Sequence, residues 1–178
     1  MDDGFYLFTV SIFNALLEST INSQLHQKDI WMIHYKLAAI ADLETLIQFV
    51  QEFHQHENLE RDETLNRNLL EHFLTDPALG QAWLIQQDDE AIGYFILTLG
   101  YSLEYEGRDA FLDELYLRPQ YRKQGIGTQT LAFAEEACRA LGVHVLHLEV
   151  DFDNSNAQHL YHTVGYQKHD RFLMSKYL

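Results

Sequence analysis

Hydrophobic and polar positions repeat with different periods along residues 32–178, and each period predicts an element. Apolar residues three and four positions apart predict an amphipathic helix after Asp42, a second helix that ends before Pro77, and a third that Gly142 closes. The expected inward stripes are Leu43, Leu46, Ile47, Val50 and Phe53 in the first helix, Leu65, Leu69 and Phe73 in the second, and Leu131, Ala134, Cys138 and Leu141 in the third.

Short runs of apolar, β-branched and aromatic residues predict strands between these helices. The polar turn 88–90 joins two of them into a hairpin, and a short helix is expected over 154–163, before Gly165. The resulting order, β-α-α-β-β-β-α-β-α-β, predicts one mixed α/β domain. The expected strands are 33–38, 82–87, 91–99, 111–117, 143–150 (as a buried strand) and 171–178.

Residues 1–31 are interpreted as an N-terminal extension ahead of a domain at 32–178. Asp2 and Asp3 stand where a secretory signal carries basic residues, and the apolar run behind them is shorter than the ~20 residues that cross a bilayer. Neither a signal peptide nor a membrane span is therefore expected. A start at Met32 is the alternative to a docking helix with the apolar positions Phe5, Phe8, Ile12 and Leu16.

The chain is strongly acidic, with 27 Asp and Glu against 12 Lys and Arg and a formal net charge of -15. Nucleic-acid binding needs clustered basic residues, so that class of function is disfavoured. The acidic balance could attract cationic substrates or serve only solubility. Cys138 is the single cysteine, which excludes an internal disulfide and fits a reducing, cytoplasmic setting.

The segment R-K-Q-G-I-G, residues 122–127, lies between a predicted strand and a predicted helix. The first N–H groups of a helix have no partner within it, the helix dipole is positive there, and glycine allows close backbone approach. Arg122 and Lys123 add positive charge, so the turn is suited to a phosphate. It matches neither a P-loop nor the dinucleotide fingerprint, and alone it could be a turn that carries glycines for geometry only.

A second motif changes that interpretation. The pattern N-x-x-A-x-x-L-Y-x-x-x-G-Y spans 154–166. With the glycine turn and the order of elements, it makes residues 32–178 resemble the GNAT superfamily of acyl-CoA-dependent N-acyltransferases. The resemblance implies a central, mostly antiparallel twisted sheet, split by a V-shaped cofactor cleft and flanked by helices on both faces. It also implies acetyl-CoA as the co-substrate.

The resemblance assigns cofactor-binding roles to three stretches of this chain. The last helix contributes Asn154 and Ala157, although Asn154 is equally suited to cap that helix. The strand before the turn runs along the pantetheine arm, and its N–H groups could polarise the acetyl carbonyl. The residues implied are Leu115, Tyr116 and Leu117 on the strand, and Arg122, Lys123, Gln124, Gly125, Ile126, Gly127 and Thr128 around the pyrophosphate.

The resemblance also implies catalytic residues. Tyr161 matches the tyrosine that protonates the departing thiolate, with packing against Tyr166 as the alternative role. Asp113 and Glu114 are the two candidates for the base that deprotonates the amine, and solvent is a third. Strand alternation places Asp113 on the face of Phe111, Leu115 and Leu117, and Glu114 on the opposite face unless a bulge re-aims it.

These features predict an enzyme that transfers an acetyl group from acetyl-CoA to a primary amine by direct attack, with a small cationic amine as acceptor. The alternatives are a protein or peptide N-acetyltransferase and a non-catalytic acyl-CoA-binding module. Cys138 is expected to be buried, which disfavours a covalent intermediate. The ten histidines do not complete a ligand set, so no metal is expected. A homodimer is left open.

Overall fold

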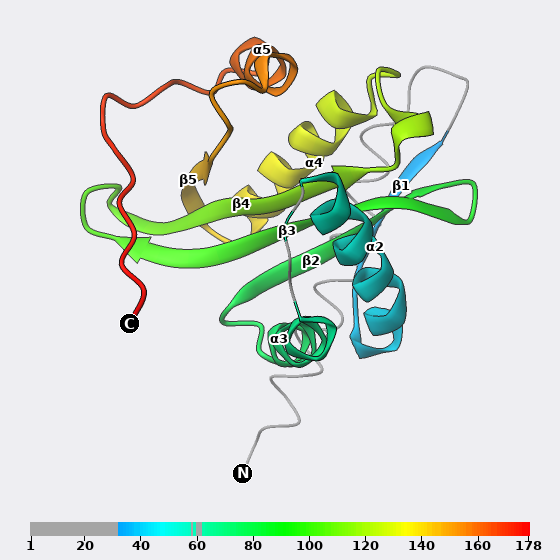
Figure 1. Cartoon of the computed structure of the whole chain (residues 1–178). Coiled ribbons are helices and arrows are strands. Elements are labelled where there is room, and N and C mark those ends of the chain that lie inside the picture. Colours follow the sequence, from blue (N-terminus) through cyan, green and yellow to red (C-terminus); the bar gives the residue numbers. More distant parts are fainter. Residues whose placement is uncertain (1–31, 58, 60–61) are drawn as a thin grey trace.

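The computed structural model describes residues 32–57, 59 and 62–178 (Figure 1). The docking helix expected near the N-terminus lies outside these residues. The strands are β1 (Ile33–Leu37), β2 (Gly80–Gln87), β3 (Glu90–Ser102), β4 (Gly107–Leu117) and β5 (Val143–Leu148). The helices are η1 (Ile40–Asp42), α2 (Leu43–His56), α3 (Glu63–Thr75), η2 (Pro119–Tyr121), α4 (Ile126–Ala140) and α5 (Ser155–Thr163).

The strands form one sheet in the order β1-β2-β3-β4-β5. Neighbours from β1 to β4 are antiparallel, and β5 joins β4 in parallel. Helix α4 covers one face of the sheet, while α2 and α3 cover the other (Figure 1). The mixed, mostly antiparallel sheet with helices on both faces confirms the predicted fold class.

Each face of the sheet has its own aromatic core. On the α4 face, the Trp83 and Phe133 rings meet edge to face, with ring centroids 4.9 Å apart. On the other face, Phe49 of α2 stacks on Tyr94 of β3 at 6.0 Å. The inward stripe expected in the first helix is largely buried, and so are Leu131, Ala134 and Cys138 in α4. The helical period therefore predicted the inward faces of α2 and α4.

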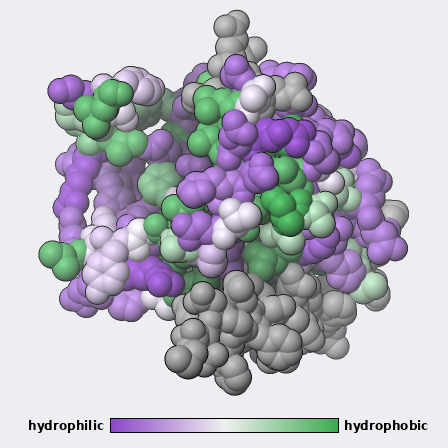
Figure 2. Space-filling model, turned by 90° about the horizontal axis from the view of Figure 1, so that it is seen from below, coloured by the Kyte–Doolittle hydropathy of each residue, from purple (hydrophilic) through white to green (hydrophobic). Residues whose placement is uncertain are grey.

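The inward face predicted for α3 is only partly right, because Phe73 packs against the core but the two leucines of the stripe do not. Leu65 and Leu69 are exposed, whereas Asn66 and Leu70 are buried. Helix α3 packs against α2, where the Asn66 side chain contacts His54, and this contact turns the helix away from its most apolar stripe. Seen from below, this side of the molecule is mostly hydrophilic with apolar groups at the surface (Figure 2).

The strand predicted over 171–178 is also wrong. This segment has no secondary structure in the described chain, and its large apolar side chains are exposed, Tyr177 to 98%. Two contacts between Arg171 and Glu104, at 3.0 and 2.8 Å, hold its start beside the β3–β4 turn. An alternating pattern forms a strand only where a neighbouring strand accepts its hydrogen bonds. The expected burial of 143–150 is likewise incomplete, because only Val143 of β5 is buried.

Two irregularities in β4 open the sheet. Ile96 of β3 pairs with Glu114 and Leu97 pairs with Leu112, so Asp113 is the extra residue of a β-bulge. The parallel pairing with β5 ends at Leu112 and Leu148, although β4 continues for five more residues. β4 therefore continues without β5 beyond this point, where the sequence predicts the split in the sheet.

Candidate active site

The last part of β4 forms one wall of the candidate site. β4 continues over 113–117 after β5 has ended its pairing. Along this stretch, main-chain N–H and C=O groups on the β5 side have no neighbouring strand. A strand edge of this kind can bond an extended amide-containing ligand. Leu115, Tyr116 and Leu117, the predicted cofactor-arm residues, lie on this free edge.

The glycine turn follows β4 through η2 and opens α4. Gly125 is the N-cap of α4, with a left-handed φ of 81°, and a Cβ placed on it would meet nothing within 4 Å. The Gly125 carbonyl accepts the N–H of Gln129, so the preceding N–H groups of the helix, at Ile126, Gly127 and Thr128, lie in the unsatisfied first turn. The turn thus presents backbone donors and a positive dipole end to open space, as the sequence predicted.

The two sequence motifs meet in space. A Cβ built on Gly127 would lie 3.3 Å from Leu160 Cδ2, so α5 packs closely on the first turn of α4. This contact brings Tyr161, the next residue of α5, to the neighbourhood of the glycine turn. A Cβ at position 127 would therefore press on the Leu160 side chain, so the absence of a side chain there allows this close packing.

The two cations of the turn differ in placement. The Arg122 side chain turns back: its Nε donates to the Leu117 carbonyl at 2.7 Å, and its Nη1 lies 3.0 Å from His56 Nε2. Its guanidinium also sits over the Tyr116 ring, 5.4 Å from the centroid. Lys123 is exposed, with a φ of 61°. Arg122 thus ties the turn to β4 and α2, which leaves Lys123 and the backbone amides facing the open side.

Tyr161 lies half-buried in α5, with its ring 5.7 Å from Tyr166 in an edge-to-face arrangement. Burial raises the pKa of the Tyr161 phenol, so it is fully protonated at neutral pH. Asn154 caps α5, with its Oδ1 accepting the Ala157 N–H at 3.1 Å. The capping role expected for Asn154 is therefore present, and its side-chain amide nitrogen is not used in that bond.

The two candidate carboxylates stand next to each other at the bulge but have different surroundings. Glu114 Oε2 accepts a hydrogen bond from Tyr94 Oη at 2.6 Å. Asp113 is more exposed, yet desolvation by the surrounding protein raises the pKa of its carboxyl group. The charges of both residues raise the pKa of Tyr94, after the larger effect of its burial. Both carboxylates therefore influence Tyr94, whose ring lies on the face of the sheet that α2 and α3 cover.

The bulge corrects the predicted faces of β4. Leu112, Leu115 and Leu117 all pack on the α4 core, so alternation does not continue across Asp113. The Phe111 ring instead contacts His147, outside that core. Sequence reasoning also missed Tyr94, because an aromatic residue in a buried strand gives no sign that its hydroxyl reaches a carboxylate.

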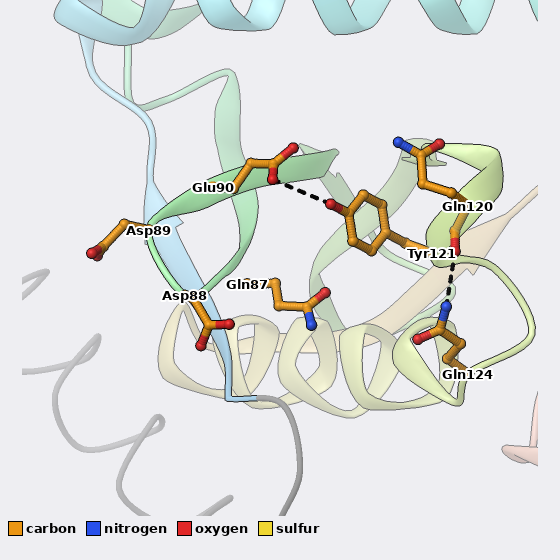
Figure 3. A pocket seen from close by; sticks show the side chains of 7 residues that line it. All are labelled: Gln87, Asp88, Asp89, Glu90, Gln120, Tyr121 and Gln124. Atoms are coloured by element: carbon orange, nitrogen blue, oxygen red, sulfur yellow. Dashed lines mark hydrogen bonds between the residues drawn. The ribbon is translucent and has the colours of Figure 1, made fainter.

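A polar hollow lies between the β2–β3 turn and the segment that leads into the glycine turn (Figure 3). Tyr121 Oη donates to Glu90 Oε2 at 3.3 Å, and Gln124 Nε2 donates to the Gln120 carbonyl at 2.8 Å. Three carboxylates border it, so its charge would repel a pyrophosphate. The hollow is therefore a poor candidate for the phosphate site that the sequence predicts at the glycine turn. The lining residues are Gln87, Asp88, Asp89, Glu90, Gln120, Tyr121 and Gln124.

The described part of the chain has neither a metal-binding cluster nor a membrane-spanning helix. No group of three or more His, Cys, Asp or Glu side chains there is arranged to hold a metal ion. None of the helices in the same residues has the length and apolar character needed to cross a membrane.

Comparison with known proteins points to one family. Residues 43–166 match the model of the acetyltransferase (GNAT) family. Thialysine N-epsilon-acetyltransferase of Bos taurus is 34% identical over 76 residues, which are 43% of this chain and 44% of that protein. The chain thus spans about half the length of the curated relatives it matches.

Solved structures agree in fold. An integron cassette protein from a salt-marsh metagenome superposes with a TM-score of 0.73 and 30% identity, covering 81% of this chain and 90% of that one. A predicted acetyltransferase with acetyl-CoA from Clostridium acetobutylicum gives a TM-score of 0.69 at 18% identity, over 82% of this chain and 96% of that one. At that identity the second likeness concerns the fold alone.

Proposed function

Because the chain belongs to the acetyltransferase (GNAT) family, we propose that it transfers an acetyl group from acetyl-CoA to a primary amine by direct attack. One observation carries the proposal: the free edge of β4, the glycine turn and Tyr161 converge where β4 and β5 separate. A strand edge and a helix start suit the two polar parts of coenzyme A, its amide-rich arm and its pyrophosphate. The acetyl-CoA bound to the similar Clostridium protein supports this choice of co-substrate.

The residues divide the binding of the co-substrate between them. The backbone amides of 125–128 and the Lys123 side chain would hold the pyrophosphate. The main chain of Leu115 to Leu117 would bond the arm, and an N–H group there would polarise the acetyl carbonyl. Arg122 contributes by holding the turn against the Leu117 carbonyl. Asn154 and Ala157 would contact the arm from α5.

Proton transfer requires one acceptor and one donor. Asp113 would take a proton from the acceptor ammonium, since desolvation raises the pKa of its carboxyl group and makes it a stronger base. The neutral amine then attacks the acetyl carbonyl, the C–S bond breaks, and Tyr161 gives its proton to the thiolate. The nitrogen loses its second proton as it becomes an amide, and that proton restores Tyr161 through solvent. Cys138 is buried, and its thiol pKa is raised to about 12, so it offers no nucleophile for a covalent route.

The acceptor is proposed to be a small cationic amine. The net charge of -15 and the carboxylates at the bulge favour an ammonium over an anionic substrate. The name of the Bos taurus relative, a thialysine N-epsilon-acetyltransferase, describes a small amine acceptor for that protein. Acetylation of protein or peptide amines is the second candidate, and a non-catalytic acyl-CoA-binding module is the third.

A thiol-release assay with acetyl-CoA tests this proposal. The panel contains thialysine, lysine, 1,3-diaminopropane, propylamine, an aminoglycoside and a peptide with a free N-terminus. We expect release of coenzyme A with at least one small amine, and product acetylation confirmed by mass spectrometry. Release with the peptide alone would favour the protein acetyltransferase. Tight acetyl-CoA binding with no release for any amine would leave the non-catalytic module.

We expect Tyr161→Phe to lower kcat about 10²-fold, toward the low end of general-acid effects because a thiolate needs little assistance to leave. Acetyl-CoA affinity, measured by calorimetry, should change little, since only the hydroxyl is removed. Tyr121→Phe is a matched control, because its hydroxyl bonds Glu90 at the hollow and serves no proposed step. An unchanged kcat in Tyr161→Phe would assign the residue to packing against Tyr166.

A further inference from the structure

A chain of polar side chains runs behind the bulge, between the sheet and the two helices that cover it. Tyr94 Oη donates to Glu114 Oε2 at 2.6 Å, and Glu114 Oε1 lies 3.7 Å from His54 Nε2. His54 Nδ1 in turn lies 3.4 Å from Asn66 Nδ2. The chain thus joins β3, β4, α2 and α3 at one point.

The chemistry of these side chains shows which atom donates and which accepts at each contact. An amide nitrogen only donates, so His54 Nδ1 accepts from Asn66. A neutral imidazole then carries its proton on Nε2, which faces Glu114. Tyr94 donates from the other side, and burial raises the pKa of its phenol well above the ordinary value, so it keeps its proton. Both neighbours therefore turn a hydrogen toward the same carboxylate.

Burial makes this arrangement costly unless it serves a purpose. Tyr94 is fully buried, and the His54 and Glu114 side chains are only 12% and 19% exposed. A carboxylate so shielded from water is tolerated when hydrogen bonds compensate it, and an apolar side chain would often stabilise a core more. Glu114 keeps a small accessible surface beside Asp113, where the acceptor amine is proposed to arrive.

The two adjacent carboxylates are therefore suited to different tasks. Asp113 has a raised pKa and suits proton abstraction. Glu114 accepts the Tyr94 hydrogen bond at 2.6 Å and lies 3.7 Å from His54 Nε2, and both contacts favour its anionic form. An anion fixed on the reacting ammonium would stabilise its protonated form and oppose the loss of the proton. Glu114 is thus better matched to a second cationic group of the acceptor, one that is not deprotonated.

We propose that Tyr94 and His54 are positioning residues that hold Glu114 as the anionic anchor for the non-reacting ammonium of a diamine acceptor. The inference rests on the proposed function, and it adds a substrate class to it. The site would accept a primary amine that carries a second cationic group. A monoamine with the same carbon chain would lack the interaction with Glu114 and would be the poorer substrate.

The test compares 1,3-diaminopropane with propylamine as acceptors. In the natural protein we expect kcat/KM to favour the diamine about tenfold to a hundredfold, the range of a hydrogen-bonded charge contact. Glu114→Gln should remove this preference, and Tyr94→Phe should lower it severalfold through the KM of the diamine. In both variants kcat/KM should fall more for the diamine than for propylamine, a difference that general damage to the fold would not give.

Two further variants complete the design. Tyr35→Phe removes a buried hydroxyl on the opposite face, 3.3 Å from Thr130 Oγ1, and should leave the preference intact. In the double variant Tyr94→Phe, Glu114→Gln, the loss should equal that of Glu114→Gln alone, because Tyr94 acts through Glu114. Additive losses would overturn the positioning role, and an equal preference for both amines in the natural protein would overturn the anchor.

Calorimetry separates this inference from the proposed function. The protein is saturated with coenzyme A and titrated with 1,3-diaminopropane. Binding that weakens at least tenfold in Glu114→Gln supports the anchor even where no acetyl transfer is observed. No binding in the natural protein, or equal binding in both, overturns the anchor, whether or not other amines are acetylated.

Discussion

Gly125→Asp is expected to abolish acetyl-CoA binding while leaving the domain folded. Gly125 adopts a φ of 81° as the N-cap of α4, and a Cβ there would project into open space. The substitution thus meets no steric clash inside the protein. The introduced carboxylate would lie where the pyrophosphate is proposed to bind, and the two negative groups would repel each other strongly.

Gly125→Asp should change the stability of the protein little, so a loss of acetyl-CoA binding could not be attributed to unfolding. A non-glycine residue in the left-handed region costs about 1 kcal/mol. An acidic side chain at the first turn of a helix gains up to about 1 kcal/mol from the dipole. The two terms nearly cancel, so Tm should move little. Loss of calorimetric binding with an unchanged Tm would therefore be a local effect.

Gly142→Asp is the matched control. Gly142 follows the other end of α4, with a φ of 70° and no atom within 4 Å of a built Cβ. It carries the same backbone strain, but its charge meets the negative end of the dipole, so it should be less stable than Gly125→Asp. It should nevertheless bind acetyl-CoA normally. Retained affinity in Gly125→Asp would place the phosphate site elsewhere.

The sequence predicted the elements of this site better than their orientation. The glycine turn was predictable because helix geometry alone leaves the first N–H groups without partners, wherever the helix lies. The bulge at Asp113 was not, because its position depends on how β3 and β4 match in length and register. The faces assigned to Phe111 and Leu115 were wrong for the same reason.

Tertiary contacts explain the other differences. The apolar stripe of α3 pointed to Leu65 and Leu69, but contact with α2 buried Asn66 and Leu70 instead. Local pattern also predicted a strand after Asp170, but this segment pairs with no strand in the described chain, although β5 ends the sheet and has a free outer edge. Tyr94 could be predicted as a core residue but not as a donor to Glu114, because that contact joins residues 20 positions apart.

Asp113→Asn is expected to slow acetyl transfer about 10²–10⁴-fold, the usual contribution of a general base. The amide cannot accept the proton of the ammonium, yet it keeps the size of the side chain. Acetyl-CoA affinity should be unchanged, because the proposed phosphate contacts lie in the glycine turn.

The pH dependence gives a second readout. The base works only when ionised, so the rate of the natural protein should fall as pH drops through the pKa of Asp113, which burial raises above the ordinary value. This acid limb should disappear in Asp113→Asn. Asp113→Asn should not lower the stability of the protein, although it lowers the rate. An acid with a raised pKa in the folded state destabilises the fold once the pH exceeds both values, so the neutral amide should preserve or increase Tm at pH 7.

Glu114→Gln distinguishes the two neighbouring carboxylates in the same assay. If Asp113 is the base and Glu114 the anchor, Glu114→Gln keeps the acid limb and loses the preference for a diamine. The reverse pattern would exchange their roles and make the Tyr94–Glu114 hydrogen bond part of the proton path. A normal rate and an unchanged acid limb in both variants would mean that solvent deprotonates the amine, and neither carboxylate at the bulge would be the base.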